Sequence, residues 1–278
     1  MWSILHLVLL IWWAPVPGEF PRAAVDVVIT SVSYSVDDVF NPFAMGSILE
    51  SVDVWIVHTD VNVEERDTLK ALLSPAETAR ARRFTFDSDR NRYISSHGIL
   101  RRILAMYCGI SADALDIYLD ANGKPGISIV GAHIQFNLSH SADVALIAVT
   151  SANCGADVEK IRPDLAHMEI AERFFTENEN DWLATLPQPV RSNGFFRLWT
   201  IKEAVLKTIG AGLSIPLNEV DVMGVVERGS ADLDVVAFGT KTRLWTSELA
   251  ILPGFAAAVA VSGEGRPIRT ITLHSVLS

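Results

Sequence analysis

The pattern of apolar and polar residues predicts a strand and then a helix early in the chain. Residues 52–58, VDVWIVH, alternate and are rich in β-branched side chains, which is typical of a strand. Ser74 and Glu77 flank the next apolar positions as a capping box, with Pro75 at the first helical position. We therefore expect a helix from Pro75 to about Arg83.

The middle of the chain predicts one long helix followed by strands. The helix runs from Asp89 to Tyr107 and stops at a glycine, which is a common helix end. Asn122–Gly126, NGKPG, marks a turn. Strands are expected at Ile134–Leu138 and Val144–Thr150, on either side of a tight connection at Ser139–Asp143.

The remainder of the chain repeats this order of elements. A strand is expected near Gly155, and it is followed by helices and then by β-rich runs. The expected elements are a helix at Leu165–Phe175, a polar break at Thr176–Asn180, a helix at Gly194–Ile209, and strands that include Asp234–Phe238 and Phe255–Val261. The repetition indicates two similar α+β halves that meet near residues 150–155, although no sequence identity between them proves a repeat.

Length and composition limit the classes of protein to which this chain can belong. Its 278 residues, 49% hydrophobic and 20% charged, suit a globular protein of one large or two modest domains. The net charge of −10 argues against non-specific nucleic-acid binding, because phosphate contacts need dense Lys and Arg.

A local basic patch stands out against this acidic background. It suits a small phosphorylated ligand or an acidic partner, and it equally suits a solvated helix face with paired charges. The patch consists of Arg80, Arg82, Arg83, Arg90, Arg92, Arg101 and Arg102.

The cysteines and the N-terminal segment bear on the compartment. Cys108 and Cys154 have no metal-ligand spacing and allow no disulfide framework, so we interpret them as buried thiols in a reducing, cytoplasmic setting. Ile4–Val16 is apolar, but it is shorter than the roughly 20 residues of a membrane span, and no Lys or Arg precedes it as in a signal peptide. We expect no membrane association, and we interpret residues 1–45 as an unassigned extension ahead of a native start at Met45, with a signal-like segment as the alternative.

The segment GADVE, Gly155–Glu159, places two carboxylates on one side of a strand. Since side chains alternate along a strand, Asp157 and Glu159 point together away from the face of Ala156 and Val158. Neighbouring carboxylates repel unless a cation or solvent relieves them, and Mg²⁺ takes such ligands together with waters and phosphate oxygens. Taken alone, the pair is equally typical of an exposed strand edge.

The segment WTIKEAVLK, Trp199–Lys207, brings three chemically distinct side chains into one helical stripe. At about 100° per residue, Trp199, Glu203 and Lys207 lie one above another. Glu203 and Lys207 are therefore candidates for a site, but they also form an ordinary i,i+4 surface pair.

The segment FNLSHS, residues 136–141, places a histidine between two serines. A histidine there suits a phosphate ligand as a hydrogen-bond donor, and it also suits a structural role in holding a turn. His140 and Ser139 are therefore candidates without a role fixed by the residues alone.

The order and spacing of these segments resemble one enzyme family. NGKPGI is followed by FNLSHS, GADVE, RFFTENE and FFRLWTIKEAVLKTIGAGLSIPL. This combination resembles the Sfp-type 4'-phosphopantetheinyl transferases from about Val52 to about Leu217, most specifically at GADVE and WTIKEAVLK. The resemblance implies an α+β fold of two similar halves, residues 46–152 and 153–278, in a pseudo-two-fold arrangement with coenzyme A in the cleft between them.

The resemblance also implies a metal site and catalytic roles. It assigns Mg²⁺ to Asp157, Glu159 and Glu203. Catalysis would involve Glu203 as the general base of the incoming serine, Lys207 near the pyrophosphate, and Asp157. Glu179 matches an acidic position near the metal region.

The coenzyme A site implied by the resemblance is largely basic. His140 matches a histidine near the 3'-phosphate, and Trp199 matches a tryptophan that packs behind the metal site. Glu77 departs from the family, which often has a basic residue there. The residues assigned to coenzyme A are Arg80, Arg92, Lys124, Ser139, His140 and Lys207.

The activity implied is transfer of 4'-phosphopantetheine from coenzyme A to a serine hydroxyl of an acyl or peptidyl carrier protein, with release of 3',5'-ADP. The two-half architecture favours a monomer that serves fatty-acid, polyketide or nonribosomal peptide carriers. One alternative is another Mg²⁺-dependent phosphotransferase, against which the lack of a Walker A or kinase signature in the sequence counts. The other is a non-catalytic coenzyme A or carrier-protein binding module, for which the three acids would be dispensable.

Overall fold

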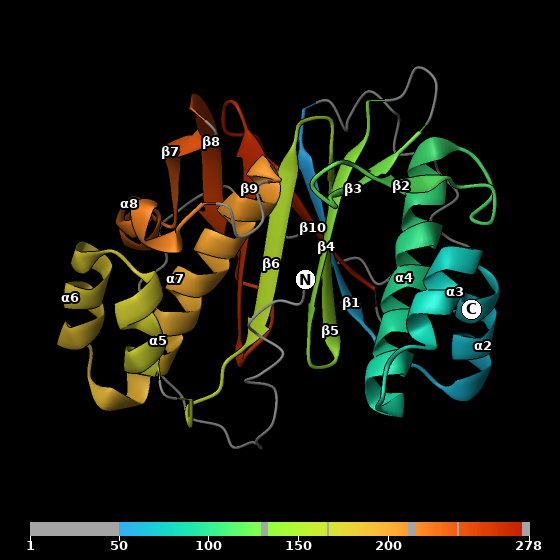
Figure 1. The fold of residues 1–278 in the computed structure, drawn as a ribbon, viewed down its shortest axis with the longest axis horizontal. Helices are drawn as coiled ribbons and strands as arrows, with labels where there is room; N and C mark the ends of the chain where they lie inside the picture. The colour runs from blue at the N-terminus through green and yellow to red at the C-terminus, as the bar shows by residue number, and fades with distance from the viewer. Residues whose placement is uncertain (1–49, 129–132, 166, 211–214, 238, 274–278) are drawn as a thin grey trace.

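The computed structural model describes residues 50–128, 133–165, 167–210, 215–237 and 239–273. The N-terminal extension and the proposed start at Met45 lie outside these ranges. The described chain is a mixed α+β protein, as its sequence predicted, with two four-stranded sheets between two groups of helices (Figure 1).

The elements of the N-terminal part lead from one strand through three helices to two β-hairpins. They are β1 (Val52–His58), α2 (Val63–Ala71), α3 (Pro75–Ala81), α4 (Asp87–Cys108), β2 (Ile117–Leu119), β3 (Pro125–Ile127), β4 (Gln135–Ser141) and β5 (Val144–Thr150).

The elements of the C-terminal part begin in the same way and end with four strands. They are β6 (Cys154–Lys160), α5 (His167–Phe174), α6 (Glu177–Thr185), α7 (Gln188–Ile209), the 3-10 helix η3 (Leu217–Glu219), α8 (Met223–Arg228), β7 (Ser230–Ala237), β8 (Thr240–Glu248), β9 (Phe255–Ser262) and β10 (Ile268–Leu273).

The two sheets have related strand orders. One sheet runs β10-β1-β5-β4 and the other β6-β9-β8-β7. In each, the first strand of the half pairs antiparallel with a later strand of the same half, β1 with β5 and β6 with β9. β10 then returns from the C-terminal end of the chain to pair in parallel with β1.

A buried polar network fixes the returning strand. Arg269 of β10 donates two hydrogen bonds of 2.6 Å to the Asp53 carboxylate, which is fully buried in β1. Tyr107 of α4 donates to the same carboxylate at 2.6 Å and accepts from Trp55 Nε1 at 3.0 Å. Because a buried charge is tolerated only when it is paired and hydrogen-bonded, this network ties the two ends of the described chain together.

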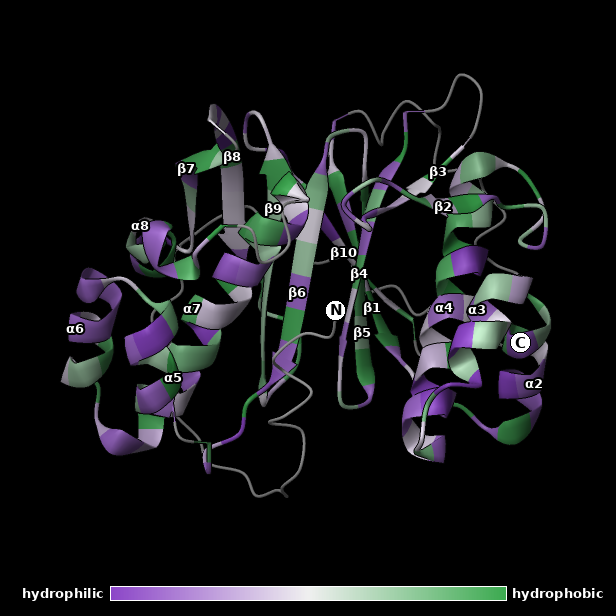
Figure 2. Cartoon of the chain, in the orientation of Figure 1, coloured by the Kyte–Doolittle hydropathy of each residue, from purple (hydrophilic) through white to green (hydrophobic). Residues whose placement is uncertain are grey.

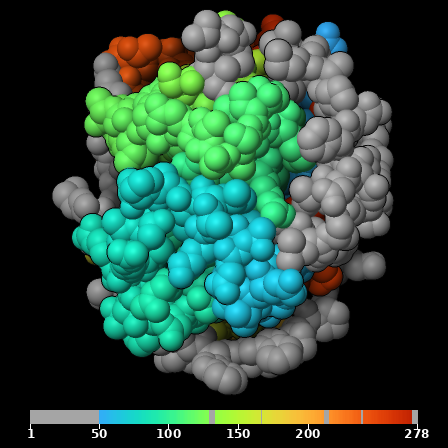
Figure 3. Space-filling view, turned by 90° about the vertical axis from the view of Figure 1, so that its right-hand side faces the viewer, coloured from blue at the N-terminus to red at the C-terminus, as the bar shows by residue number. Residues whose placement is uncertain are grey.

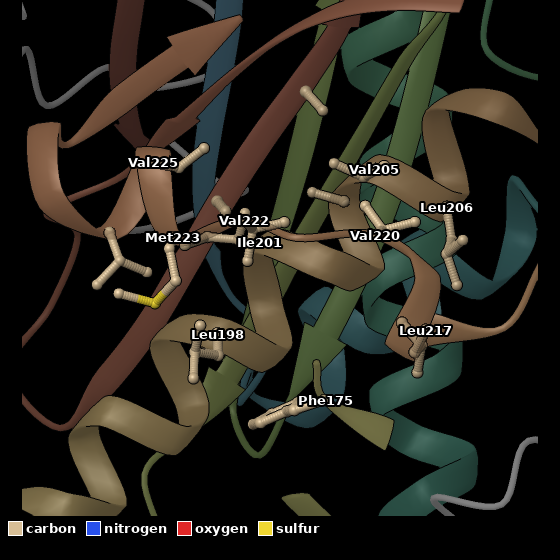
Figure 4. Close-up of a cluster of buried hydrophobic side chains, with 14 of the residues drawn as sticks. Phe175, Leu198, Ile201, Val205, Leu206, Leu217, Val220, Val222, Met223 and Val225 are labelled. Atoms are coloured by element: carbon tan, nitrogen blue, oxygen red, sulfur yellow. The ribbon is translucent and has the colours of Figure 1, made fainter. Parts of the chain in front are cut away.

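Three layers of apolar side chains hold the helices and sheets together. One layer lies between the two sheets and includes Val54, Leu146, Ala156 and Val259. A second joins α4 to the sheet of β1, and the third joins the C-terminal helices to the sheet of β6. Figure 4 shows part of the third layer, in which Ile201, Leu198 and Phe175 meet residues of η3 and α8.

The outer surface is formed largely by the helices. Hydrophilic residues lie along both helix groups (Figure 2). Seen from one side, α2, α3 and α4 together with the segment around β2 form a continuous face (Figure 3). No helix in the described ranges combines the length and apolarity that spanning a membrane requires.

Helix ends follow the signals in the sequence. Ser74 and Glu77 form the complete capping box of α3. α4 ends at Gly109 and α7 at Gly210, and both glycines have the left-handed backbone conformation that glycine adopts without steric cost.

Two sequence-based assignments were wrong. The polar stretch Thr176–Asn180 is not a break, because Thr176 and Glu179 form a second complete capping box and start α6. The expected connection at Ser139–Asp143 is mostly strand, since β4 continues to Ser141 and leaves only Ala142 and Asp143 as the hairpin turn. Ala142 has a φ of 52°, which is the conformation that two-residue hairpin turns require.

Candidate active site

The acidic pair of the sequence lies on the helix-facing side of β6. Ala156 and Val158 are fully buried in the layer between the sheets. Asp157 and Glu159 therefore point to the opposite side, where α7 packs against β6. Asp157 is buried, whereas Glu159 is partly exposed.

Gly155 allows α7 to approach this strand closely. A β-carbon at Gly155 would lie 2.2 Å from the Ala204 carbonyl oxygen and 2.5 Å from the Thr208 nitrogen, both of which are backbone atoms of α7. No side chain other than hydrogen fits there unless the helix moves. This close approach brings the residues of α7 into reach of the carboxylates on β6.

Lys207 joins the helix to the acidic pair. Its Nζ lies 2.6 Å from Asp157 Oδ1 and donates further hydrogen bonds to Ser139 Oγ at 3.0 Å and to the Ala156 carbonyl at 3.2 Å. Ser139, on β4, itself donates to Asp157 Oδ1 at 2.8 Å. Asp157, Ser139 and Lys207 thus form one connected polar cluster from three elements.

Burial and mutual repulsion shift the titration of the surrounding acids. Burial, and after it the charge of Asp157, raises the pKa of Glu159 to about 7. The same two causes raise the pKa of Glu203, on α7, to about 7. Burial acts to lower the pKa of Lys207, but the charges of Asp157, Glu203 and Glu159 outweigh it and hold that pKa above its ordinary value.

The cluster is suited to a divalent cation, although it is not a preformed cage. Within the described ranges, no three His, Cys, Asp or Glu side chains already converge as a metal site. Asp157 Oδ2, however, is buried and has no hydrogen-bond partner among the described residues. Mg²⁺ prefers oxygen ligands, and a buried carboxylate oxygen without a hydrogen-bond partner is a ligand of that kind. Two further acids of the same sign of charge, Glu159 and Glu203, lie close to it.

The basic residues assigned from the sequence lie in three different environments. The guanidinium of Arg80 is 5.7 Å from the ring centre of Tyr93, and Arg92 forms a partly exposed ion pair of 3.1 Å with Asp89. Lys124 donates to the backbone carbonyls of Cys154 and Thr208, so it connects the β2–β3 hairpin to β6 and α7.

His140 lies close to this basic group. Its side chain, on β4, is exposed, and His97, Lys207, Arg92 and Asp89 are near enough for their charges to act on it. The structure therefore brings His140, Arg92 and Lys207 into one neighbourhood, while Lys124 is held by backbone carbonyls.

His97 is a candidate that the sequence did not reveal. Its ring stacks on Tyr93 with 4.0 Å between ring centres, and its Nδ1 lies 3.5 Å from Glu77 Oε1. Only its spacing of four residues from Tyr93 and from Arg101 on one helix would have pointed to this face. Ser141 of β4 was also missed as a contact of β6, because the strand was expected to end at Leu138. Asn137 lay within the expected strand, but its contact with β6 joins distant parts of the chain.

Three further residues singled out in the sequence make structural contacts. Glu179 forms an ion pair of 2.7 Å with Lys202 and accepts a hydrogen bond from the Val222 backbone. Trp199 stacks on Phe195 in the core of the C-terminal part. Glu77, at the position where the family often has a basic residue, pairs with the buried Arg101 and so stabilises the fold.

Comparison with protein families adds independent information. A model described as the 4'-phosphopantetheinyl transferase superfamily matches residues 153–260. A second model, described as the N-terminal part of 4'-phosphopantetheinyl transferase, matches residues 62–152. Together they cover the described elements from α2 to β8 and most of β9.

Curated relatives share this similarity. The chain is 37% identical over 176 residues to 4'-phosphopantetheinyl transferase HetI from Nostoc sp., which covers 62% of this chain and 74% of that protein. It is 30% identical over 205 residues to 4'-phosphopantetheinyl transferase ffp from Bacillus subtilis, covering 73% and 88% of the two chains. It is 28% identical to 4'-phosphopantetheinyl transferase Sfp from Bacillus subtilis strain 168 over the same length and shares.

Proposed function

Because the chain belongs to the 4'-phosphopantetheinyl transferase superfamily, we propose that the cluster of Asp157, Glu203 and Lys207 is the active site at which it acts. The enzyme transfers phosphopantetheine to a carrier protein. The site assignment rests on one observation above the others: the buried Asp157 carboxylate, bonded to Lys207 and Ser139 through Oδ1, keeps Oδ2 without a hydrogen-bond partner among the described residues.

Asp157, Glu159 and Glu203 are the residues that would hold Mg²⁺. Their carboxylates provide oxygen ligands, and a cation would relieve the repulsion that raises the pKa of Glu159 and Glu203. When bound, the ion would neutralise charge on the pyrophosphate of coenzyme A. Ser139 and Lys207 keep Asp157 in one orientation for that purpose.

The protein residues divide the work of the transfer. The serine oxygen of the carrier forms a bond to the β-phosphorus of coenzyme A, and the bond from that phosphorus to the oxygen of 3',5'-ADP breaks. Glu203 accepts the proton of the serine hydroxyl as the general base. Lys207 adds positive charge where the departing oxygen becomes negative. Positioning and charge neutralisation provide most of the catalysis in such transfers.

The basic residues on the other side of the site would bind coenzyme A. Arg80, Arg92 and His140 lie on or beside α3, α4 and β4, and His140 is exposed. We assign the 3'-phosphate to His140, because the charges of Arg92 and Lys207 reach it and would attract an anion there. Lys124 is assigned to the edge of this region.

We also propose that residues 46–152 and 153–278 are two halves related by an approximate two-fold axis, with the active site between them. The related strand orders and the two 22-residue helices α4 and α7, each ending at a left-handed glycine, support this arrangement. We expect a cytoplasmic enzyme, because its two cysteines are free thiols. The expected carriers belong to fatty-acid, polyketide or nonribosomal peptide synthesis.

One assay tests this function against its alternatives. The protein is incubated with coenzyme A, Mg²⁺ and an apo carrier protein, and the carrier is weighed by mass spectrometry. A gain of one phosphopantetheine is expected. Nucleotide hydrolysis with an unmodified carrier would instead indicate another phosphotransferase, and binding of coenzyme A without turnover would indicate a binding module.

Variants test the site assignment in the same assay. Asp157→Asn, Glu203→Gln and Lys207→Ala are each expected to lower kcat by about 10²–10³-fold, because each removes a charge that acts on the reacting groups. Asp234→Asn removes one partner of an exposed 2.9 Å ion pair with Lys241 and is the matched control that retains activity. Full activity of Asp157→Asn or Glu203→Gln would refute their assignment.

A further inference from the structure

The edges of the two sheets meet at the candidate active site. β4 is the last strand of one sheet and β6 is the first strand of the other, and the two lie side by side at the centre of the molecule (Figure 1). Side chains of β4 form hydrogen bonds to β6 from three alternate positions. An edge strand with free backbone groups is a liability that a protein has to cover, and here polar side chains cover it.

The bonds of this side-chain ladder occur in register. Asn137 Oδ1 accepts from the Ala156 backbone nitrogen at 2.9 Å. Ser139 Oγ donates to Asp157 Oδ1 at 2.8 Å, and Ser141 Oγ donates to Glu159 Oε2 at 2.7 Å. Residue numbers rise together on both strands, so side chains at alternate positions of β4 meet Ala156, Asp157 and Glu159 of β6 in turn.

The Ser141 hydroxyl has both of its roles fixed. The backbone nitrogen of Lys160 donates to Ser141 Oγ at 3.1 Å, which occupies a lone pair of that oxygen. The hydroxyl proton is then directed at Glu159 Oε2, and the bond of 2.7 Å is typical of a charge-assisted hydrogen bond. Holding a glutamate side chain in one conformation restricts rotation about several of its bonds. Ser141 supplies this restraint on Glu159 from the other half of the protein.

We propose that Ser141 is a positioning residue, which holds the Glu159 carboxylate beside Asp157 so that the N-terminal half sets the geometry of the acidic cluster on the C-terminal half. This inference rests on the proposed function, since it gives Glu159 its role as an Mg²⁺ ligand. Groups that orient a metal ligand from behind change metal affinity or activity by about 10–100-fold when they are lost.

Two serines of the chain allow a matched experiment. Ser141→Ala removes the hydroxyl from Glu159, and Ser141→Thr retains a hydroxyl. Ser151→Ala is the control, because Ser151 Oγ also forms a 2.7 Å bond with a charged side chain, Arg266, but away from the acidic cluster. Each variant is first checked for folding by its urea unfolding curve.

Metal binding and turnover are measured separately. Binding of Mn²⁺ alone is followed by electron paramagnetic resonance, and carrier modification is followed with Mg²⁺. Ser141→Ala is expected to weaken Mn²⁺ binding and to lower kcat, each by about 10–100-fold. Ser141→Thr should recover most of both losses, and Ser151→Ala should change neither. If Ser141→Ala does not fold, Ser141→Cys keeps the volume, donates only weakly, and carries the same expectation.

A coupling measurement separates this proposal from the assignment of the active site. In the Glu159→Gln variant, adding Ser141→Ala should lower Mn²⁺ affinity and kcat much less than Ser141→Ala does in the original protein. The reason is that the two residues act through one contact. Suppose that Ser141→Ala keeps Mn²⁺ affinity and kcat within two-fold of the original protein while Asp157→Asn is inactive. That result would overturn the role of Ser141 and leave the proposed function intact. An original protein that modifies no carrier would overturn the proposed function itself.

Discussion

The N-terminal and C-terminal parts of the chain contain the same type of ion pair in different surroundings. Arg101 of α4 donates to Glu77 Oε2 at 2.7 Å, and Lys202 of α7 lies 2.7 Å from Glu179 Oε2. Both glutamates are the third residue of their helix, α3 or α6, and each completes a capping box there. Each cation also donates to two backbone carbonyls that follow its own helix, those of Ala112 and Leu115 for Arg101 and those of Leu217 and Val220 for Lys202.

The surroundings of the two pairs differ in exposure. The side chains of Lys202 and Glu179 are both fully buried, and the second oxygen of Glu179 accepts from the Val222 backbone. The Glu77 side chain is 14% exposed, and its second oxygen faces His97 beside the basic patch. The pair of Lys202 and Glu179 therefore joins α6 to α7 inside a core. The pair of Arg101 and Glu77 joins α3 to α4 at the surface proposed to bind coenzyme A.

The first strands of the two parts differ at the site itself. The helix-facing side chains of β1 are Trp55 and Val57, which pack in the apolar layer beneath α4. At the matching positions of β6 stand Asp157 and Glu159. The place that one half uses for its hydrophobic core holds charged groups in the other. Folding alone does not require those charges, so their presence indicates function.

The largest expected effect concerns the fully buried ion pair of Lys202 and Glu179, which lies outside the proposed active site. Lys202→Met should lower the free energy of unfolding by about 3–5 kcal/mol, because it leaves the Glu179 carboxylate buried without its cation. Urea unfolding measures this loss. Lys202→Met combined with Glu179→Gln should recover part of it, since no unpaired charge is left and the amide oxygen can still accept the capping hydrogen bond from the Thr176 backbone. A loss under about 1 kcal/mol in the single variant would contradict the structural role.

A smaller effect is expected where α7 meets β6. In Gly155→Ala, the added carbon would lie 2.2 Å from the Ala204 carbonyl oxygen, so the helix has to shift. We expect the free energy of unfolding to fall by about 1–3 kcal/mol. We also expect kcat to fall by more than this loss of stability explains, because the Lys207–Asp157 contact depends on the close approach of α7 to β6.

Gly224→Ala is the matched control for this substitution. Its added carbon would approach only the flexible end of the Arg228 side chain, 2.6 Å from Nη2, so that side chain can move aside. Unchanged unfolding and kcat are expected there. If Gly155→Ala were as well tolerated as Gly224→Ala, close packing would not be what holds Lys207 in place.

The sequence predicted the elements whose signals are local. The alternating residues of β1 gave its bounds, Val52–His58, without error, and glycines marked the ends of both long helices. The start of α6 was missed although its signal is of the same kind, because the polar run Thr176–Asn180 is typical of a break between elements as well as of a capping box. α2 was not predicted at all.

The candidate site divides in the same way. Helical and strand periodicity indicated that Glu203 and Lys207 share a face and that Asp157 and Glu159 share another. That α7 approaches β6 at Gly155 is a tertiary fact, and the contacts from β4 to β6 join residues of different halves. Such pairings depend on how two sheets meet, which no local pattern in one sequence specifies.

The smallest expected effect concerns the partly buried ion pair of Glu77 and Arg101 and its response to acid. Burial acts to raise the pKa of Glu77, but hydrogen bonds from His97, the Ser74 backbone and Arg101 outweigh it and lower that pKa to about 2. A carboxylate with a depressed pKa contributes stability that is fully present above its unfolded value of 4.5 and is lost as the pH falls toward 2. The stability advantage of the original protein over Glu77→Gln should therefore be about 1–2 kcal/mol smaller at pH 3 than at pH 7, as measured by urea unfolding. Glu64→Gln, at an exposed position in α2, should show no comparable change. If the stability advantage over Glu77→Gln were equal at both pH values, Arg101 and His97 would not hold Glu77 in its charged form. The pair of Glu77 and Arg101 would then resemble the buried pair of Glu179 and Lys202 in its geometry but not in its charge.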